Sequence, residues 1–410
     1  MTMTRKVYSI LAVCWLCALT SCVDYNDVTN ETAVSIQLLQ PEGCVTPADL
    51  SGHEVTLIQG ERSISATTNV NGVATFTNLI PDVYDISCSW ELSEADYHQL
   101  TGSTQAVSGC TISGSLNTQL IKEEQTISLS TQLSVNQDII ISKIYYAGSK
   151  DDNNKAYDAG KYIELYNQSN KDVDVSGYYI GLVENESDQA YKLEKLNEVY
   201  QDSVVLLKQI FRIPVNANHK VKAGETVLIV NSAVNHTSNN STENDLSGAD
   251  FEAKDVSGKL QNNPAIPALE LIYTMYSSVS TMNLTGSGPC GVVIFRTDED
   301  ITILPTTYPY GKDTYLREWK LLPKRMILDA VEVLSNRATG VAVDTKRLYD
   351  DLDAGYININ AISGRSGEVV YRKTSKKTDD GRIILMDTNN SSNDFKVSST
   401  IKPREYDDEE

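Results

Sequence analysis

Apolar and polar residues alternate with a period of two over much of the first third of the chain. Two stretches show this most clearly, and their apolar positions are Tyr84, Ile86, Cys88 and Trp90, then Cys110, Ile112, Gly114 and Leu116. Such alternation places successive side chains on opposite faces of a strand, so both stretches predict half-buried β-strands. Further short strands are expected over residues 34–38, 54–58, 73–76 and 127–135. Strands this short and closely spaced predict an all-β sandwich over residues 32–135.

The dipeptide Asn71-Gly72 stands between two of these strands and predicts a hairpin turn, because both residues tolerate positive φ. The surrounding run from Thr67 to Tyr84 resembles the middle of carboxypeptidase regulatory-like, transthyretin-like sandwich domains. The shared features are the turn dipeptide, an aromatic strand residue, a Leu and a Pro-Gly-x-Tyr motif, in which Asp82 replaces the usual Gly. In such domains these residues are structural, so the resemblance implies no chemistry.

A second series of strand-like blocks begins at Ile139. The blocks that follow are Lys161–Asn167, Val173–Ile180, Ala223–Val230, Gly291–Phe295, Asp329–Glu332, Tyr371–Thr374 and Asp387–Phe395. Their motifs and order resemble bacterial lamin-tail-like domains. The resemblance implies an immunoglobulin-like sandwich over residues 137–400, in which Glu164 and Asp174 belong to the fold signature. The chain is therefore expected to hold two sandwiches in tandem, with a boundary near residues 133–138.

The second region is longer than a lamin-tail-like domain, and the excess forms insertions, largely over residues 185–214 and 231–288. Long structured insertions on a sandwich are frequent places for binding. Short helices are predicted over residues 191–196 and 315–322, the second ending at Pro323. Residues 401–410 are acidic and are expected to form a solvated, disordered tail.

The first 21 residues read as a signal peptide, with Arg5 and Lys6 before an apolar run from Val7 to Leu19. Leu19-Thr20-Ser21-Cys22 fits the lipobox of bacterial lipoproteins, which makes Cys22 the expected lipid-attachment residue and 22–31 a tether. The whole layout resembles a family of Gram-negative cell-envelope lipoproteins of unknown function. We expect an outer-membrane lipoprotein, held to the membrane only by its N-terminal lipid and exposed on the cell surface in one alternative.

The net charge of the chain limits the classes of partner that we expect it to bind. The 410 residues carry 35 Lys and Arg against 55 Asp and Glu, a formal net charge of −20. Binding to nucleic acid depends on basic side chains that displace counterions from phosphates, so no nucleic-acid partner is expected. A glycan or a neighbouring envelope protein remains as the expected partner.

Cys88 and Cys110 lie on neighbouring predicted strands, and both should face a core. Export through the membrane permits disulfides, and these two cysteines form the favoured pair. The alternative is that both are buried free thiols, which behave as small hydrophobic side chains.

Only a few residues suggest chemistry. His236, Asp250 and Glu252 fall in the largest insertion and are the candidate binding-loop residues, with solvated loop residues as the alternative. The clusters that begin at Asp151 and at Asp351 carry the oxygen ligands that calcium selects, although neither has the Gly and Glu of an EF-hand. A structural calcium is thus one alternative, and no other metal or cofactor is indicated.

Two classes of function compete. No HExxH, GxSxG or Walker A pattern occurs in the sequence, and no region is left over for a separate catalytic domain. We therefore expect a non-catalytic module that binds or displays a glycan, a peptide or an envelope protein. The alternative is a secreted hydrolase acting on polysaccharide or nucleic acid, because paired carboxylates can be recognised only in the fold.

Overall fold

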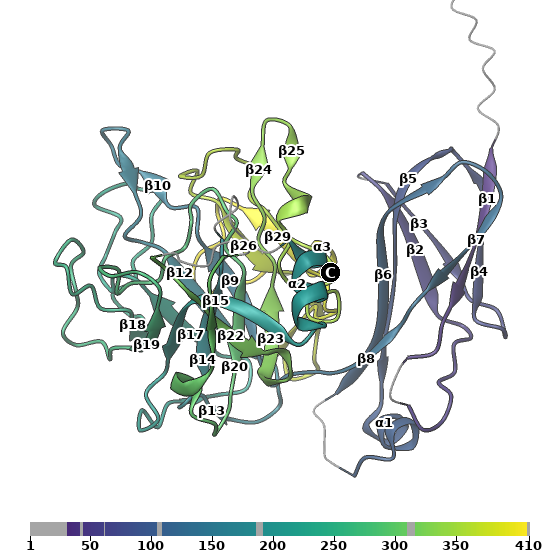
Figure 1. The fold of residues 1–410 in the computed structure, drawn as a ribbon, viewed down its shortest axis with the longest axis horizontal. Coiled ribbons are helices and arrows are strands. Elements are labelled where there is room, and N and C mark those ends of the chain that lie inside the picture. Colours follow the sequence, from purple (N-terminus) through teal and green to yellow (C-terminus); the bar gives the residue numbers. More distant parts are fainter. Residues whose placement is uncertain are drawn as a thin grey trace, which may run out of the picture.

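Two β-sandwiches stand side by side in the computed structural model, which describes residues 31–41, 44–60, 62–104, 109–185, 192–309 and 316–407 (Figure 1). The all-β fold class predicted from the sequence is confirmed. The helices are short: α1 Glu94–Thr101, α2 Leu193–Tyr200, α3 Ser391–Asp394, and the 3-10 segments η1 Ile301–Ile303, η2 Lys324–Met326 and η3 Val343–Thr345. Within these described ranges, no helix is both long enough and apolar enough to cross a membrane.

The first sandwich packs a five-stranded sheet, in the order β3-β2-β5-β6-β8, against a three-stranded sheet, in the order β4-β1-β7. Its strands are β1 Thr32–Leu38, β2 Glu54–Gln59, β3 Arg62–Thr67, β4 Val73–Leu79, β5 Asp82–Leu92, β6 Cys110–Ile121, β7 Gln125–Leu129 and β8 Gln132–Val135. Alternate side chains of β1 are buried, as the period-two pattern requires.

The turn at Asn71-Gly72 corrects one prediction. Gly72 has a φ of +73°, so the turn itself is present. It does not close a hairpin, however, because β3 before it pairs with β2 while β4 after it pairs with β1. The chain crosses from one sheet to the other here. A local dipeptide fixes the reversal of the chain but not the partner of the next strand.

The second sandwich packs a six-stranded sheet, in the order β18-β17-β12-β9-β26-β29, against a seven-stranded sheet, in which β21-β22-β15-β14-β20-β23 are joined by β19 on β15. The strands of the first of these sheets are β9 Ile139–Tyr145, β12 Tyr162–Asn167, β17 Thr226–Val230, β18 Phe251–Glu252, β26 Val369–Arg372 and β29 Phe395–Ser398. Those of the second are β14 Tyr179–Val183, β15 Val204–Arg212, β19 Glu270–Thr274, β20 Val292–Phe295, β21 Thr306–Thr307, β22 Trp319–Pro323 and β23 Ile327–Val331.

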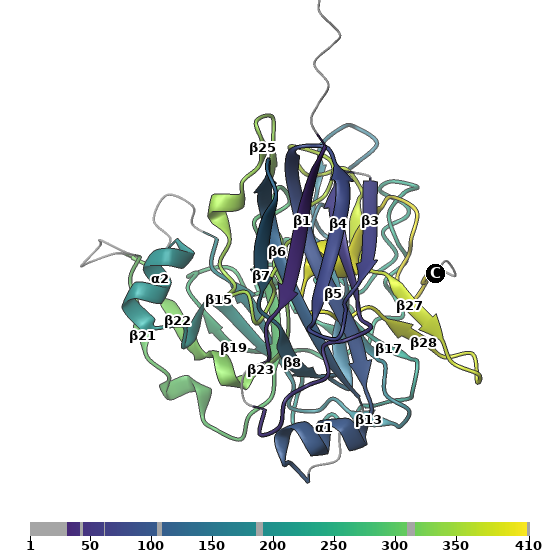
Figure 2. The same ribbon diagram turned by 90° about the vertical axis from the view of Figure 1, so that its right-hand side faces the viewer.

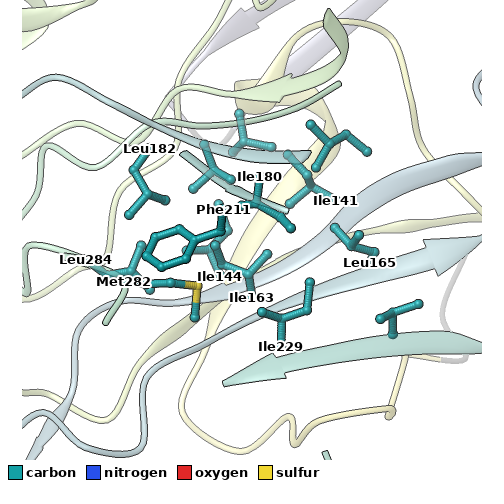
Figure 3. Packing of buried hydrophobic residues seen from close by; sticks show 14 of the residues in the cluster. Ile141, Ile144, Ile163, Leu165, Ile180, Leu182, Phe211, Ile229, Met282 and Leu284 are labelled. Carbon is teal, nitrogen blue, oxygen red and sulfur yellow. The ribbon is translucent and has the colours of Figure 1, made fainter. Parts of the chain in front are cut away.

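The main core fills the space between these two sheets. Figure 3 shows Ile141, Ile163 and Ile229 from the six-stranded sheet meeting Ile180 and Phe211 from the seven-stranded sheet. All five side chains are completely or almost completely buried. Apolar burial on this scale is the principal term that stabilises a sandwich of two sheets.

Four two-stranded ribbons extend from the second sandwich in the described part of the chain. They are β10 Ser149–Lys150 with β11 Ala156–Tyr157, β13 Val173–Asp174 with β16 Lys220–Val221, β24 Asn336–Arg337 with β25 Gly340–Val341, and β27 Thr374–Lys377 with β28 Ile383–Leu385. The helix predicted over 191–196 is present as α2, with a later start and end. The helix predicted over 315–322 is wrong, because Trp319–Pro323 forms β22 and pairs with β15.

The two sandwiches are in direct contact beyond their short connection. Strand β8 ends at Val135 in the first sandwich, and β9 begins at Ile139 in the second. The Ser113 hydroxyl on β6 donates to the Thr388 carbonyl at 3.1 Å, and the Asn117 amide donates to the Ala354 carbonyl at 2.9 Å. The outer face of β6 is therefore covered by the second sandwich, so Thr111 and Ser113 are buried although the alternation marks them as solvent-facing.

The end of the described chain corrects another prediction. Residues 401–407 do not form a solvated tail; they pack on the outer face of the six-stranded sheet. Tyr406 donates a hydrogen bond of 2.7 Å to Glu164, and the Lys143 ammonium lies 3.6 Å from the centre of the Tyr406 ring. The negative charge of this segment is partly balanced by Lys396, whose ammonium pairs with the Asp407 carboxylate at 2.5 Å. Residues 408–410 lie outside the described part.

Candidate functional site

His236 is completely buried and has a structural role. Its Nδ1 atom lies 2.6 Å from the Tyr157 hydroxyl, and its Nε2 atom lies 2.8 Å from the Ser232 carbonyl. The Nδ1 contact holds the insertion against the β10–β11 ribbon, and the Nε2 contact lies within the insertion. No nitrogen of this imidazole remains for a ligand or a proton transfer at the surface.

Asp250 and Glu252 also serve the backbone of the insertion. Asp250 accepts a hydrogen bond of 2.7 Å from the Leu228 amide and pairs with Arg404 at 3.0 Å. Glu252, completely buried, accepts from the Ala233 amide at 2.6 Å and pairs with Lys254. The structure therefore overturns both sequence interpretations, because these carboxylates neither join His236 in a binding loop nor extend into solvent.

The two acidic clusters considered for calcium bind hydrogen-bond donors of the chain. Asp353 is buried and accepts from the amides of Glu332, Gly355 and Ser391, at 2.7, 3.0 and 2.8 Å. Asp151 accepts from the amides of Asn153 and Lys155 within its own turn. Among the described residues, no group of three or more His, Cys, Asp or Glu side chains is arranged to hold a metal ion.

The predicted disulfide between Cys88 and Cys110 is absent, and both are free thiols. Both face the interior, as predicted, but the register places Cys88 opposite Gly114 and Cys110 opposite Leu92. This offset of four residues along paired strands separates the two sulfurs by roughly 13 Å, well beyond the reach of a disulfide. Burial raises the pKa of Cys88 to about 12 and that of Cys110 to about 11.

Glu164 and Asp174, the two acidic residues of the lamin-tail signature, both have structural roles. Glu164 on β12 and Lys143 on β9 are both completely buried, 2.6 Å apart. Burial lowers the pKa of Lys143, while the adjacent Glu164 opposes that shift. Asp174 closes a tight turn by accepting from the Ser176 amide at 2.9 Å. Both acidic residues thus act in the fold, in the way that the resemblance implied.

Two grooves that could receive a ligand lie on either side of the joint between the sandwiches. Seen from the side of the first sandwich, α2 lies to one side of the joint and the β27–β28 ribbon to the other (Figure 2). The groove near β27–β28, called here the basic groove, has a volume of about 630 Å³. The groove near α2, called here the acidic groove, has a volume of about 850 Å³.

The basic groove takes its walls from both sandwiches. Its basic side chains are Lys171, Lys376 and Arg382, and it also contains Glu91, which pairs with Lys376 at 2.7 Å across the joint, and Glu94. The lining also includes the polar residues 136–137 and 168–170 and the apolar side chains of Leu92, Cys110 and Ile384. Such a surface offers both hydrogen-bond partners and apolar contacts.

The acidic groove has the opposite charge. Its lining includes four carboxylates, Glu194, Asp202, Asp350 and Asp351, and no basic side chain. Behind the wall, Lys324 pairs with Asp202 at 2.6 Å and with Asp351 at 2.7 Å. The opposite wall comes from the first sandwich, from residues 39–40 and 130–134. Grooves between domains are common ligand sites, and these two differ in the ligand charge they favour.

Sequence reasoning missed both grooves because their walls come from segments far apart in the chain. The acidic groove joins residues 130–134 to residues 349–351, and nothing in either segment marks the other. Leu193, Glu194, Asn197 and Asp202 belong to the insertion over residues 185–214. One sequence feature could have indicated the grooves. The connector between the two sandwiches is short, and a short connector keeps the two sandwiches close enough to form grooves between them.

Fold and joint together define the chain as a tandem β-sandwich protein whose second sandwich has the lamin-tail, immunoglobulin-like form. Residues 132–271 match the family model for the Lamin Tail Domain. Residues 222–401 match the family model described as "Protein of unknown function (DUF4876)". The search of curated proteins found no match.

One solved structure supports the fold. The crystal structure of a DUF4876 family protein from Bacteroides thetaiotaomicron is similar over 89% of this chain and 94% of that chain, with 21% sequence identity and a TM-score of 0.56. A DUF3823 family protein from Parabacteroides merdae matches 37% of this chain and 66% of that chain, with 12% identity and a TM-score of 0.16. The first likeness supports the fold, and the second is too weak to support any argument.

Proposed function

We propose that this protein is a lipid-anchored cell-envelope lipoprotein that binds or displays a glycan, a peptide or a neighbouring envelope protein, without catalysis. The observation that carries the proposal is the joint, where two sandwiches in direct contact form a groove on each side. A ligand in either groove contacts both bodies at once. Since the hydrogen bonds across the joint are already made, binding requires little ordering of the protein.

The lipid anchor rests on the sequence, because Cys22 lies outside the described residues. The lipobox at Leu19–Cys22 supports it, and labelled palmitate should enter the native chain. We expect the Cys22→Ala variant to remain unlabelled and to leave the membrane fraction. Label in that variant would contradict the anchor, and protease treatment of intact cells would decide between the two faces of the outer membrane.

The alternative, a hydrolase, is supported by the four carboxylates that line the acidic groove, but not by the carboxyl groups whose pKa is raised. A general acid needs a raised pKa and access to the substrate. Burial raises the pKa of Asp329 and Glu332 to about 7 and that of Asp394 to about 6. All three are inside the second sandwich and line neither groove. They hold chain segments together instead.

The test combines a glycan array with a pull-down of envelope proteins, each run with and without calcium. The native chain should retain a ligand, and replacing charged residues in one of the grooves should weaken retention. Two pairs serve this purpose: Lys376→Gln with Arg382→Gln in the basic groove, and Glu194→Gln with Asp350→Asn in the acidic groove. Turnover of a polysaccharide or nucleic acid, abolished by one Asp or Glu substitution, would overturn the proposal in favour of the hydrolase.

A further inference from the structure

The acidic groove contains two polar atoms whose hydrogen-bonding capacity is unused within the described chain. The Tyr349 side chain lines the groove, is only 5% exposed, and its hydroxyl has no hydrogen-bond partner. The Oδ1 atom of Asp351, in the same lining, is also buried and has no hydrogen-bond partner. Leaving such atoms unpaired costs free energy, so together they point to a bound group that supplies the missing partners.

The protein already holds one ammonium group beside these atoms. Lys324 lies between Asp202 and Asp351, and its Nζ atom is 5.3 Å from the centre of the Tyr349 ring. An aromatic ring flanked by carboxylates is a favourable environment for a cation. The four carboxylates of the lining outnumber by two the lysines paired with them, Lys324 and Lys346. The groove therefore keeps a negative charge that a cationic ligand would balance.

The wall opposite the carboxylates is the free edge of a strand. Strand β8 is the last strand of its sheet and pairs only with β6 among the described strands. Its residues Gln132, Leu133 and Ser134 line the groove and are partly exposed. A free strand edge presents backbone donors and acceptors in the spacing that another extended chain requires. The nearby Leu39 is 41% exposed and adds an apolar contact.

We propose that the acidic groove binds an extended peptide segment bearing lysine or arginine, which pairs with the free edge of β8 and directs its basic side chains toward Glu194, Asp350 and Asp351. The partner is a neighbouring protein that presents such a segment. This inference rests on the proposed binding function and specifies its ligand class for one groove. A neutral glycan would not balance the excess negative charge of the groove. A lone metal ion would not form hydrogen bonds with the backbone at the edge of β8.

The test uses the purified full-length chain and a fluorescent octapeptide in which lysine alternates with threonine and valine. We expect saturable binding by fluorescence anisotropy, weakened as salt is raised, and no binding of the matched peptide with glutamate in place of lysine. Glu194→Gln with Asp350→Asn should weaken binding about tenfold, because two exposed ion pairs are lost. The control pair, Glu198→Gln with Asp344→Asn, removes the same charge from exposed positions outside the lining and should change nothing.

Two further measurements separate the strand edge and the hydroxyl from general charge attraction. Two methylated peptides are compared, one with methyl groups on the odd-numbered backbone nitrogens and one with methyl groups on the even-numbered ones. One of the two should bind at least tenfold more weakly, because its methyl groups remove the hydrogen bonds to β8. Tyr349→Phe should weaken binding while leaving the unfolding midpoint unchanged or higher, since an unpaired buried hydroxyl is removed.

Three results would overturn the inference. They are no saturable binding of the lysine peptide, equal effects of the groove pair and the control pair, and calcium binding that the groove pair abolishes while the peptide does not bind. A neutral glycan or an envelope protein retained independently of Glu194 and Asp350 would remove this inference while leaving the proposed function in place. Absence of any ligand in the array and the pull-down would remove both.

Discussion

Arg372 donates to both carboxylate oxygens of Asp329, at 2.9 and 3.0 Å, and so joins the two sheets of the second sandwich. Arg372 belongs to β26 in the six-stranded sheet, whereas Asp329 belongs to β23 in the seven-stranded sheet. The same guanidinium reaches Asp387 at 3.1 Å and Asp394 at 3.3 Å. Three motifs that the sequence places far apart thus meet at one buried side chain.

Removal of this guanidinium should strongly destabilise the second sandwich. Arg372→Ala leaves three carboxylates without their counter-ion, and breaking a buried pair in this way costs about 3–5 kcal/mol. Arg372→Lys should recover only part of the loss, since an ammonium cannot bind both oxygens of Asp329 in the same geometry. Urea unfolding measures the change. As a control, Arg325→Gln breaks an exposed pair with Glu299 and should shift the free energy of unfolding by less than about 0.5 kcal/mol.

Stability should fall as pH rises from about 4 to about 7. Burial raises the pKa of Asp329 and of Glu332 to about 7; at Asp329 the neighbouring Asp387 adds to the rise while Arg372 opposes it. Between the unfolded and folded pKa values the folded chain binds more protons, so raising the pH removes stability, on the order of 3–4 kcal/mol for each of the two groups. Unfolding at pH 5, 6, 7 and 8 measures this slope, and Asp394→Asn should flatten it. Equal stability at pH 5 and pH 8 would contradict the prediction.

Tyr406 should contribute to stability although it lies four residues from the end of the sequence. Tyr406→Phe loses the hydrogen bond to Glu164 and should cost about 1–2 kcal/mol. Tyr406→Ala also uncovers Lys143 and should cost about 2–4 kcal/mol. Lys402→Ala, an exposed change in the same segment, should have almost no effect. A solvated tail would give no effect for any of the three.

Cys88 and Cys110 should be alkylated without prior reduction once the chain is unfolded. In the folded protein both should react slowly at pH 8, because burial raises their pKa values to about 12 and about 11 and only thiolates react. Mass spectrometry after iodoacetamide treatment in urea, with no reductant, measures this. If the peptide containing Cys88 stayed covalently linked to the peptide containing Cys110, the two cysteines would form a disulfide, and the four-residue offset between them would be wrong.

A fragment beginning at Asn136 should fold alone. Its core between the two large sheets contains no residue of the first sandwich. It loses only the polar contacts across the joint, such as the bond from Asn389 to Ser134 at 2.7 Å. We expect one cooperative urea transition, shifted modestly to lower urea. A broad, non-cooperative transition would show that the two sandwiches depend on each other for folding.

The parts of the fold that follow local rules could be predicted from the sequence. Alternation marked the strands around Cys88 and Cys110, and the order of motifs marked the second sandwich. The helix expected over 315–322 failed because Trp319 and Leu322 are buried in a strand covered on both faces. A short apolar run of this kind has no periodicity that separates a strand from a helix.

The candidate site was less predictable for a different reason. Charged residues in long insertions usually face solvent, and this led to the interpretation of His236 and Glu252 as loop residues. In the structure the insertion folds back, and its many backbone amides need acceptors that Glu252 and Asp250 supply. The grooves depend on how two bodies meet, which no local pattern of residues encodes.

The length of the first sandwich separates the start of β1 from the basic groove. The described chain enters β1 beside the end of β6 at Ile121, since Thr32 pairs with Leu79 and the following strand begins with Asp82 opposite Ile121. The end of β5 and the start of β6, whose residues line the basic groove, lie at the other end of these long strands (Figure 1). The 12 residues of β6 span about 40 Å. In the proposed lipoprotein, in which Cys22 bears the lipid, the basic groove thus lies at the end of the first sandwich opposite to the end at which β1 follows the anchored segment.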